Sequence, residues 1–343
     1  FWGLQFHVVE LTGTCRFGGD QLRVLYAGTK PFFGYFKAMA FSRKPKEKKL
    51  GTYSIFALDQ VRRAKEWDIE VYRGHRIFAN IGLFPSSLFV PEWISGTADL
   101  ESQKDCDQTS KSRRRDRAML QRNDISYRVT REVCDLDYFY EQMYKPHMQE
   151  EHADSAHLMT RDKMLSHVLD QEGRLILISK GGAEVGGSLI IHEAGRPRLY
   201  SQGILNNDRE LKRNGVGTAI YLCSYDHLIS EGYSEVHMGW SRALLADGSL
   251  YFKQRFGFQY HAASANGHFI NYSGGTRACN EFLVNCGFIH RRYGAAKATI
   301  FRSEGDEQTV RTKNKQAMCR TMGLSSINVV DLKPQDRQAA LQS

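Results

Sequence analysis

Residues 211–258 constrain the chain most, because a glycine-broken basic loop is followed there by a helix pattern, a strand pattern and a second helix pattern. Glycine lets the main chain approach an anion closely, and the start of a helix favours negative charge. The loop reads Lys212-Arg213-Asn214-Gly215-Val216-Gly217. We therefore expect its backbone amides to hold the phosphate of a bound donor molecule.

The apolar pattern on both sides of this loop predicts a mixed α/β sheet. Runs of antiparallel strands that give way to a strand-helix-strand unit are typical of such a sheet. The predicted strands before the loop are 175–178, 185–191 and 199–204. The loop is followed by a predicted helix at 218–232, a strand at 235–240 and a closing helix at 247–257.

Two helices are predicted before the first of these strands. Leu136, Phe139, Tyr140 and Met143 have the spacing of a buried helical stripe, which Asp135 or Asp137 could cap. A second helix could begin at Thr160 and turn four apolar residues inward, namely Met164, Leu165, Val168 and Leu169.

The loop and the elements after it resemble the GNAT acyltransferase superfamily, whose pyrophosphate loop begins with arginine or glutamine. Lys212 stands at that position here and keeps the positive charge. Further residues are similar to a bacterial branch with two tandem GNAT folds, related to the FemAB-type peptidoglycan aminoacyltransferases. These residues are Trp240-Ser241-Arg242, Asp247-Gly248, Lys253 and Phe256-Gly257, and the resemblance covers about 126–303.

The resemblance implies a mixed, mostly antiparallel GNAT-type sheet flanked by helices, in two tandem units of which the first is degenerate. We expect residues 1–122 to form the degenerate N-terminal unit and a connector, since 97–122 is polar with almost no large apolar residue. Residues 123–303 would form the acyltransferase domain. Residues 304–343 are polar and are expected to form a C-terminal tail.

Members of these groups transfer an acyl group from acyl-CoA, or an aminoacyl group from charged tRNA, to an amine, and the resemblance alone does not choose between these donors. In the GNAT fold the pantetheine arm of the donor inserts between two splayed strands, which correspond to 200–203 and 237–240. A backbone N–H near Gln202 or Gly203 would stabilise the oxyanion. The loop from Lys212 to Gly217 would hold the pyrophosphate.

The catalytic acid is not assigned by the sequence. Many GNAT enzymes place a proton-donating tyrosine where this chain has Lys253, and Tyr251 lies about half a turn away. Lys253 could hold a phosphate or carboxylate of the acceptor, hold a tRNA end, or be a solvated lysine. Asp247 could belong to the site or cap the closing helix. Glu151, in the acidic loop 149–157, could act as a base or belong to a surface turn.

The net charge of +9 predicts attraction to polyanions without naming one. The basic run 43–49 contains a proline and no apolar period, so it is expected to be an exposed loop. The run 111–117 could form the first turn of a helix that contacts nucleic acid or lipid, or could be a solvated face.

The seven cysteines form no Cys-x-x-Cys pair and predict free thiols in a reducing compartment such as the cytoplasm, and the resemblance implies a bacterial one. Cys223 falls within an apolar helix and is interpreted as structural. The histidines show no metal-binding spacing, and no apolar run approaches the ~18 residues of a membrane-spanning helix.

Three functions follow from these features. The first is an N-acyltransferase that moves an acyl group from acyl-CoA to an amine on a small molecule or polymer. The second is a FemAB-like aminoacyltransferase that uses aminoacyl-tRNA, favoured by the tandem folds, the positive charge and Lys253. The third is a non-catalytic binding protein that kept the GNAT fold, which the missing tyrosine motivates.

Overall fold

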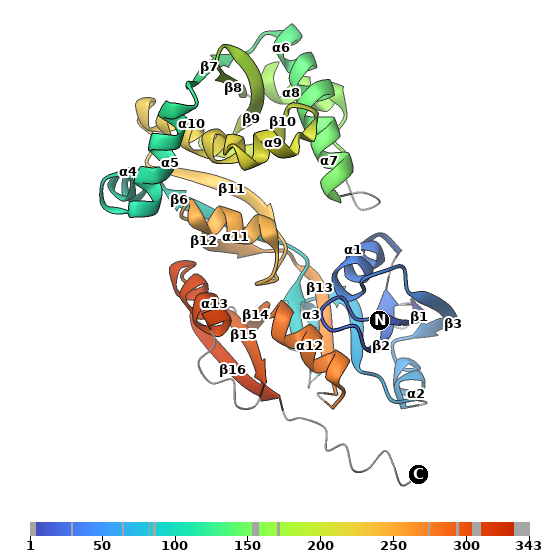
Figure 1. Ribbon diagram of the computed structural model, residues 1–343. Coiled ribbons are helices and arrows are strands. Elements are labelled where there is room, and N and C mark those ends of the chain that lie inside the picture. Colours follow the sequence, from blue (N-terminus) through green and yellow to red (C-terminus); the bar gives the residue numbers. More distant parts are fainter. Residues whose placement is uncertain are drawn as a thin grey trace. The chain divides into compact units, whose positions relative to one another are not determined.

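The chain forms two compact units in the computed structural model (Figure 1). Unit 1 comprises Phe1–Ile94, Ser241–Gln254 and Tyr260–Ser343, and unit 2 comprises Ser95–Trp240 and Arg255–Gln259. The structure describes residues 5–28, 30–63, 65–81, 83–84, 87–152, 158–169, 172–273, 275–292, 295–303 and 310–332. Unit 2 is thus inserted into the sequence of unit 1.

The N-terminal part of unit 1 contains β1 (Gln5–Thr14), β2 (Gln21–Gly28), α1 (Lys30–Ala40), β3 (Lys46–Ser54), α2 (Leu58–Arg63), β4 (Ile69–His75), α3 (Ile77–Asn80) and β5 (Leu88–Pro91). Its later part contains most of α11 (Gly248–Arg255) and β12 (Gln259–Ala263), followed by β13 (Asn266–Tyr272), α12 (Arg277–Cys286), β14 (Phe288–Arg292), β15 (Ala295–Ser303), α13 (Val310–Thr321) and β16 (Ser326–Leu332).

The larger sheet of unit 1 has the order β3-β1-β2-β4-β13-β5. Strand β13 comes from the later part of the chain and pairs antiparallel with both β4 and β5. Because successive side chains of a strand point to opposite faces, Phe269 enters the core formed with Phe6 and Phe89, while His268 faces the other side. A smaller sheet has the order β14-β15-β16.

Unit 2 contains β6 (Ile94–Asp99), α4 (Leu100–Thr109), α5 (Lys111–Arg122), β7 (Ile125–Thr130), α6 (Val133–Tyr138), the π-helix η1 (Phe139–Tyr144), α7 (Lys145–His152) and α8 (Arg161–Leu169). These are followed by β8 (Arg174–Lys180), β9 (Ala183–Glu193), β10 (Arg196–Ile204), the short 3₁₀ turn η3 (Leu205–Asn207), α9 (Arg209–Arg213), α10 (Val216–Ser230) and β11 (Glu235–Ser241).

The strands of unit 2 lie in the order β6-β11-β10-β9-β8-β7. Two adjacent glycines of β9 let helices pack closely on both faces of this sheet. A Cβ at Gly186 would lie 2.8 Å from Val216 Cγ1 of α10, and one at Gly187 would lie 3.0 Å from Phe139 Cδ2 of η1. Helix α10 therefore covers one face, and η1 covers the other with the buried stripe that includes Leu136 and Met143 (Figure 1).

The predicted fold class is confirmed: the protein is a mixed α/β structure with mostly antiparallel sheets flanked by helices. The predicted strands in 175–204, the helix after the loop, the strand after it and the closing helix are also confirmed by β8, β9, β10, α10, β11 and α11. Thr160 caps α8 as predicted, with its Oγ1 accepting from Lys163 N at 3.4 Å.

Two helix details were predicted wrongly. Leu169 is 54% exposed rather than inward-facing. The residue at the N-cap of α6 is Glu132, whose side chain makes no cap hydrogen bond. Asp135 and Asp137 instead each accept two hydrogen bonds from a guanidinium group, Asp135 from Arg128 and Asp137 from Arg161.

The expected connector at 97–122 is wrong, because these residues form the end of β6 and the helices α4 and α5. Arg117 of α5 links α4 and α5 to α10 within unit 2. Its Nε donates to Asp107 Oδ2 of α4 at 2.9 Å, and its Nη1 donates to Asp226 Oδ2 of α10 at 2.6 Å. Polar residues here make ion pairs within unit 2 instead of linking domains. The division into units also differs from the predicted boundary at 122/123.

Two other polar segments adopt regular structure. The expected tail does not hold for 310–332, where α13 buries Met318 and Cys319 and β16 pairs in parallel with β15. Residues 304–309 and 333–343 lie outside the described part. The expected loop at 43–49 is a strand from Lys46 onward, and its lysines are exposed on the edge strand β3. Charged edge strands are a common protection against further strand pairing.

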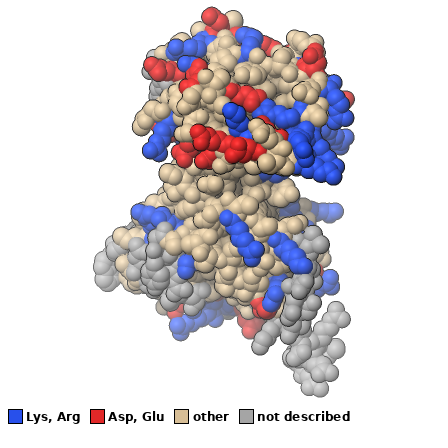
Figure 2. All heavy atoms as spheres, turned by 90° about the vertical axis from the view of Figure 1, so that its left-hand side faces the viewer, with Lys and Arg blue, Asp and Glu red and all other residues tan. Residues whose placement is uncertain are grey.

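The surface carries charges of both signs. Figure 2 shows acidic side chains interspersed with basic ones on the face in view. In the part of the chain that the structure describes, no helix combines the length and apolar character needed to cross a bilayer.

Candidate functional site

Strands β10 and β11 of unit 2 run parallel and separate after a single point of pairing. Their only register pair among the described residues is Arg198 with His237. Beyond it, β10 continues to Ile204 and β11 to Ser241, while β10 remains paired with β9 on its other side. The facing edges of β10 and β11 therefore leave backbone groups that a ligand can pair with.

A β-bulge lies in β10 at the start of this gap. The register with β9 shifts between Leu199 and Ser201, so Tyr200 is the extra residue. The Tyr200 ring packs against His167 at a centroid distance of 4.6 Å, and the Arg198 guanidinium lies 5.0 Å from its centre. Bulges bend a strand and re-aim its residues, and they are frequent beside active sites.

Gln202 and Gly203 follow the bulge on β10, as the sequence predicted. Successive N–H groups of a strand point to opposite edges, so one of these two residues directs its N–H toward the gap. Gly203 also lies tightly against η1: an added Cβ would be 2.6 Å from the carbonyl carbon of Met143. This contact is why only glycine fits at position 203.

The loop residues Gly215, Val216 and Gly217 form the beginning of α10. Gly215 is the N-cap residue in a left-handed conformation, with φ of 85°, and no side chain caps the helix. The first amides of an α-helix have no acceptor within the helix. Those of Val216, Gly217 and Thr218 are therefore oriented to bind an anion.

The basic residues of the loop lie in a helix. Lys212 and Arg213 occupy the last turn of α9, which Asp208 caps by accepting from Leu211 N at 2.8 Å. Asn214 is the C-cap residue of α9, and Gly215 N donates to Lys212 O at 3.1 Å. The predicted loop is thus a tight turn between two helices, with positive side chains immediately before the start of α10.

A polar network holds the turn between β10 and α9. Asn207 is buried, with φ of 51°; its Oδ1 lies 2.8 Å from His147 Nδ1, and its Nδ2 donates to Glu150 Oε2 at 2.7 Å. Sequence reasoning missed His147 and Asn207, although a turn of polar residues between a strand and a helix was a signal. Glu150 takes part in this network from α7, so it does not belong to an acidic surface turn.

The other predicted base cannot be evaluated in the same way. Glu151 lies in α7, but its side chain lies outside the described residues, as do residues 153–157 of the acidic loop.

The three remaining predicted residues lie around α11, in unit 1. Asp247 Oδ1 accepts from Leu250 N at 2.8 Å, so Asp247 caps this helix. Lys253 is only 7% exposed, which excludes the interpretation as a solvated lysine, whereas Tyr251 is 58% exposed. The two side chains therefore point in different directions, and Tyr251 does not take the position of Lys253.

The cysteines form no disulfide; Cys106 is half-buried, Cys134 is exposed and the other five are buried. Burial raises the pKa of the Cys223 thiol to about 12, so at neutral pH it is protonated and a poor nucleophile. This agrees with a structural role for Cys223. Within the described ranges, no cluster of three His, Cys, Asp or Glu side chains could hold a metal ion.

Residues 107–254 match the family model described as the acetyltransferase (GNAT) domain. The match covers the gap between β10 and β11, the turn before α10, and α11 up to Gln254. This segment, less than half of the chain, is similar to the GNAT domain that the resemblance predicted. The match begins earlier than the predicted 126 and ends well before 303.

Several solved structures are similar to the chain at low identity. The C-terminal domain (DUF2156) of a putative lysylphosphatidylglycerol synthetase from Agrobacterium fabrum is 10% identical, with 77% of this chain and 83% of that chain covered and a TM-score of 0.35. A GCN5-related N-acetyltransferase from Sphaerobacter thermophilus is 11% identical, with 77% of this chain and 76% of that chain covered and a TM-score of 0.37. FemX is 9% identical, with 74% of this chain and 81% of that chain covered and a TM-score of 0.38. No curated protein matches the chain.

Proposed function

We propose that this protein is an N-acyltransferase that moves an acyl group from acyl-CoA to an amine. The observation that carries the proposal is the divergence of β10 and β11 after Arg198 and His237, together with an uncapped start of α10. The matched GNAT domain spans both features. A donor with an amide-containing arm and a pyrophosphate has the chemistry that both features complement.

Each part of the donor has a corresponding group in unit 2. The amides of the pantetheine arm would pair with the separated edges of β10 and β11. The pyrophosphate would accept hydrogen bonds from the amides at Val216 to Thr218, with Lys212 and Arg213 supplying positive charge. The N–H of Gln202 or Gly203 would bind the thioester oxygen as it becomes an oxyanion.

The reaction would proceed by attack of a neutral amine on the thioester carbonyl carbon. The new C–N bond forms, the C–S bond breaks, and CoA leaves as a thiolate that must gain a proton. We keep Lys253, Asp247, Glu151 and Tyr251 as candidates for the proton transfers.

The variant Gly217→Glu tests the donor site. Gly217 lies in the first turn of α10, where a carboxylate is favourable for the helix but would occupy and repel the pyrophosphate position. Acetyl-CoA should raise the melting temperature of the wild type as expected from RT ln(1 + [L]/Kd). In Gly217→Glu the affinity should fall by about 100-fold, or about 2.7 kcal/mol.

Ser234→Glu is the matched control, because it adds the same charge just beyond the opposite end of α10 at an exposed position. It should bind acetyl-CoA like the wild type. Equal binding by wild type and Gly217→Glu would refute the placement of the site.

Aminoacyl-tRNA is the alternative donor, and the net charge of +9 favours it. If the protein retains charged tRNA and no acyl-CoA raises its melting temperature, aminoacyl-tRNA would replace acyl-CoA as the proposed donor. Binding of acetyl-CoA without acylation of any amine tested would instead indicate a non-catalytic binding protein. Seven cysteines that form no disulfide support a reducing compartment such as the cytoplasm as the place of action.

A further inference from the structure

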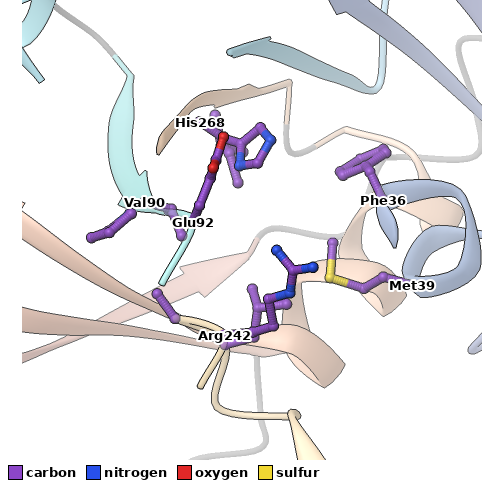
Figure 3. Close-up of a pocket in the computed structure, with 10 residues that line it drawn as sticks. Phe36, Met39, Val90, Glu92, Arg242 and His268 are labelled. Atoms are coloured by element: carbon purple, nitrogen blue, oxygen red, sulfur yellow. The ribbon is translucent and has the colours of Figure 1, made fainter. Parts of the chain in front are cut away.

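A small pocket of unit 1 lies on the sheet face that His268 occupies, away from the phenylalanine core. Its volume is about 30 Å³, and its lining includes Phe36, Met39, Glu92, Arg242 and His268 (Figure 3). A single water needs roughly 10–15 Å³ on this scale. The pocket therefore has room for a polar group of about three heavy atoms, not for a whole cofactor.

Strand β13, which lies between β4 and β5, places the polar residues of the pocket in register. His268 lies between Arg73 of β4 and Val90 of β5. Glu92 follows β5, and its backbone N–H binds Asn266 O at 3.0 Å. The Glu92 carboxylate forms an ion pair with Arg73. Each of these groups is thus fixed by the sheet.

Arg242 approaches the pocket from the segment after β11. Its side chain is only 9% exposed, and its guanidinium carbon lies 3.7 Å from the centre of the Trp93 ring. Stacking on an aromatic ring orients the guanidinium plane and lowers the cost of holding it in one place. Figure 3 shows this guanidinium directed into the space between Glu92, Phe36 and Met39.

His268 adds an unsatisfied polar atom to the pocket. Its Nε2 is buried and has no hydrogen-bond partner among the described residues. Burying such an atom is unfavourable unless a ligand or a water satisfies it. Burial, with added repulsion from Arg73 and Arg242, lowers the pKa of His268 to about 3, so the imidazole is neutral at pH 7 and can donate one hydrogen bond.

We propose that this pocket binds the carboxylate of a small organic acid, with Arg242 and His268 as its hydrogen-bond donors. Arg242, Arg73 and Glu92 together carry one net positive charge, which a monoanion neutralises. A phosphate dianion would leave excess negative charge beside Glu92, and a cation would be repelled by Arg242. Phe36 and Met39 provide an apolar wall for the carbon chain that bears the carboxylate.

Saturation-transfer NMR with propionate and propionamide tests this site on the full chain. The two probes have nearly the same shape, but only propionate carries a charge. Propionate should bind saturably, and propionamide should bind at least tenfold more weakly. N-acetylglycine is a second arm: tighter binding than propionate would assign the pocket to the carboxyl end of a larger molecule, and weaker binding would assign it to a free short acid.

Arg242→Met should weaken propionate binding at least tenfold. Arg43→Met removes the same charge from an exposed position of unit 1 and should not change it. If Arg242→Met fails to fold, Arg242→Lys keeps the charge without the planar fork and should still weaken binding several-fold. Equal binding of propionate and propionamide, preference for inorganic phosphate, or unchanged binding in the Arg242 variant would overturn the proposal.

The inference is independent of acyl transfer. Gly217→Glu should bind propionate like the wild type even though it loses acetyl-CoA, so each site can fail without the other.

Discussion

Each unit contains a pair of parallel strands within its main sheet, and the two pairs differ in how far they stay joined. In unit 1, β2 and β4 align over four consecutive residues, from Val24 with Ile69 to Ala27 with Tyr72. In unit 2, β10 and β11 align only at Arg198 with His237. A closed pair has its backbone groups satisfied within the sheet, whereas an open pair offers them to a ligand. Unit 1 therefore has its pocket on a sheet face, and unit 2 has its gap within the sheet.

Truncating one large side chain in each core gives the largest test of this difference. Phe139 and Phe269 are both fully buried, in unit 2 and unit 1 respectively. Each change to alanine should cost about 3–5 kcal/mol of unfolding free energy in denaturant titrations. Only Phe139→Ala should also weaken acetyl-CoA binding, because η1, which carries Phe139, packs against β10 at the edge of the gap. Loss of acetyl-CoA binding in Phe269→Ala alone would reverse the assignment of the donor to unit 2.

A buried lysine gives unit 1 a pH dependence of its own. Lys315 Nζ donates to Val284 O at 2.8 Å and to Asn285 O at 2.9 Å, at the end of α12. Burial lowers its pKa to about 8, from about 10.4 in an unfolded chain. Because the pKa of Lys315 is lower in the folded state than in the unfolded chain, the neutral lysine contributes its full stability above about pH 10.4. This contribution is lost as the pH falls through about 8.

Lys315→Met removes this titration. Between pH 10.5 and pH 7 the wild type should lose about 3 kcal/mol of unfolding free energy relative to Lys315→Met, because the mutant has no buried proton to accommodate. Denaturant titrations of both proteins at the two pH values measure this difference, in which other titrating groups cancel. If the unfolding free energies of the wild type and Lys315→Met change by the same amount between the two pH values, the two carbonyl contacts compensate for the burial of the charge.

Gly203→Ala should have the smallest effect. The new Cβ meets main-chain atoms of η1, so the end of β10 must shift and the gap beside it must change. We expect acetyl-CoA to bind about tenfold more weakly, or about 1.4 kcal/mol, by calorimetry. Gly248→Ala is the control, because its Cβ has nothing within 4 Å. Equal affinities in the two variants would show that the gap tolerates movement of β10.

The sequence predicted the elements whose stabilising contacts are local or strictly periodic. Strands β8 and β9 are continuous, largely apolar runs bounded by turn residues, and the buried stripe from Leu136 to Met143 repeats at the helical period. The glycine turn before α10 was likewise predicted, because left-handed backbone at a helix start requires such a residue.

The remaining features depend on residues far apart in the chain. Residues 97–122 were predicted to be a connector because the partner of their polar side chains lies far away in the sequence. Arg117 of α5 binds Asp226, more than 100 positions later. The pocket of unit 1 was not predicted either, since Glu92, Arg242 and His268 meet only when β13 enters the sheet. No local pattern carries that information.

The position of β13 fixes the order in which the protein can be completed. Until Tyr272 has been synthesised, β4 and β5 each have an open edge, and the sheet of unit 1 is divided into two parts. All of Ser95–Trp240 has been synthesised before then. Unit 2 begins later in the sequence than unit 1 and is nevertheless able to fold first. The N-terminal strands of unit 1 can complete their sheet only after β13 has been made.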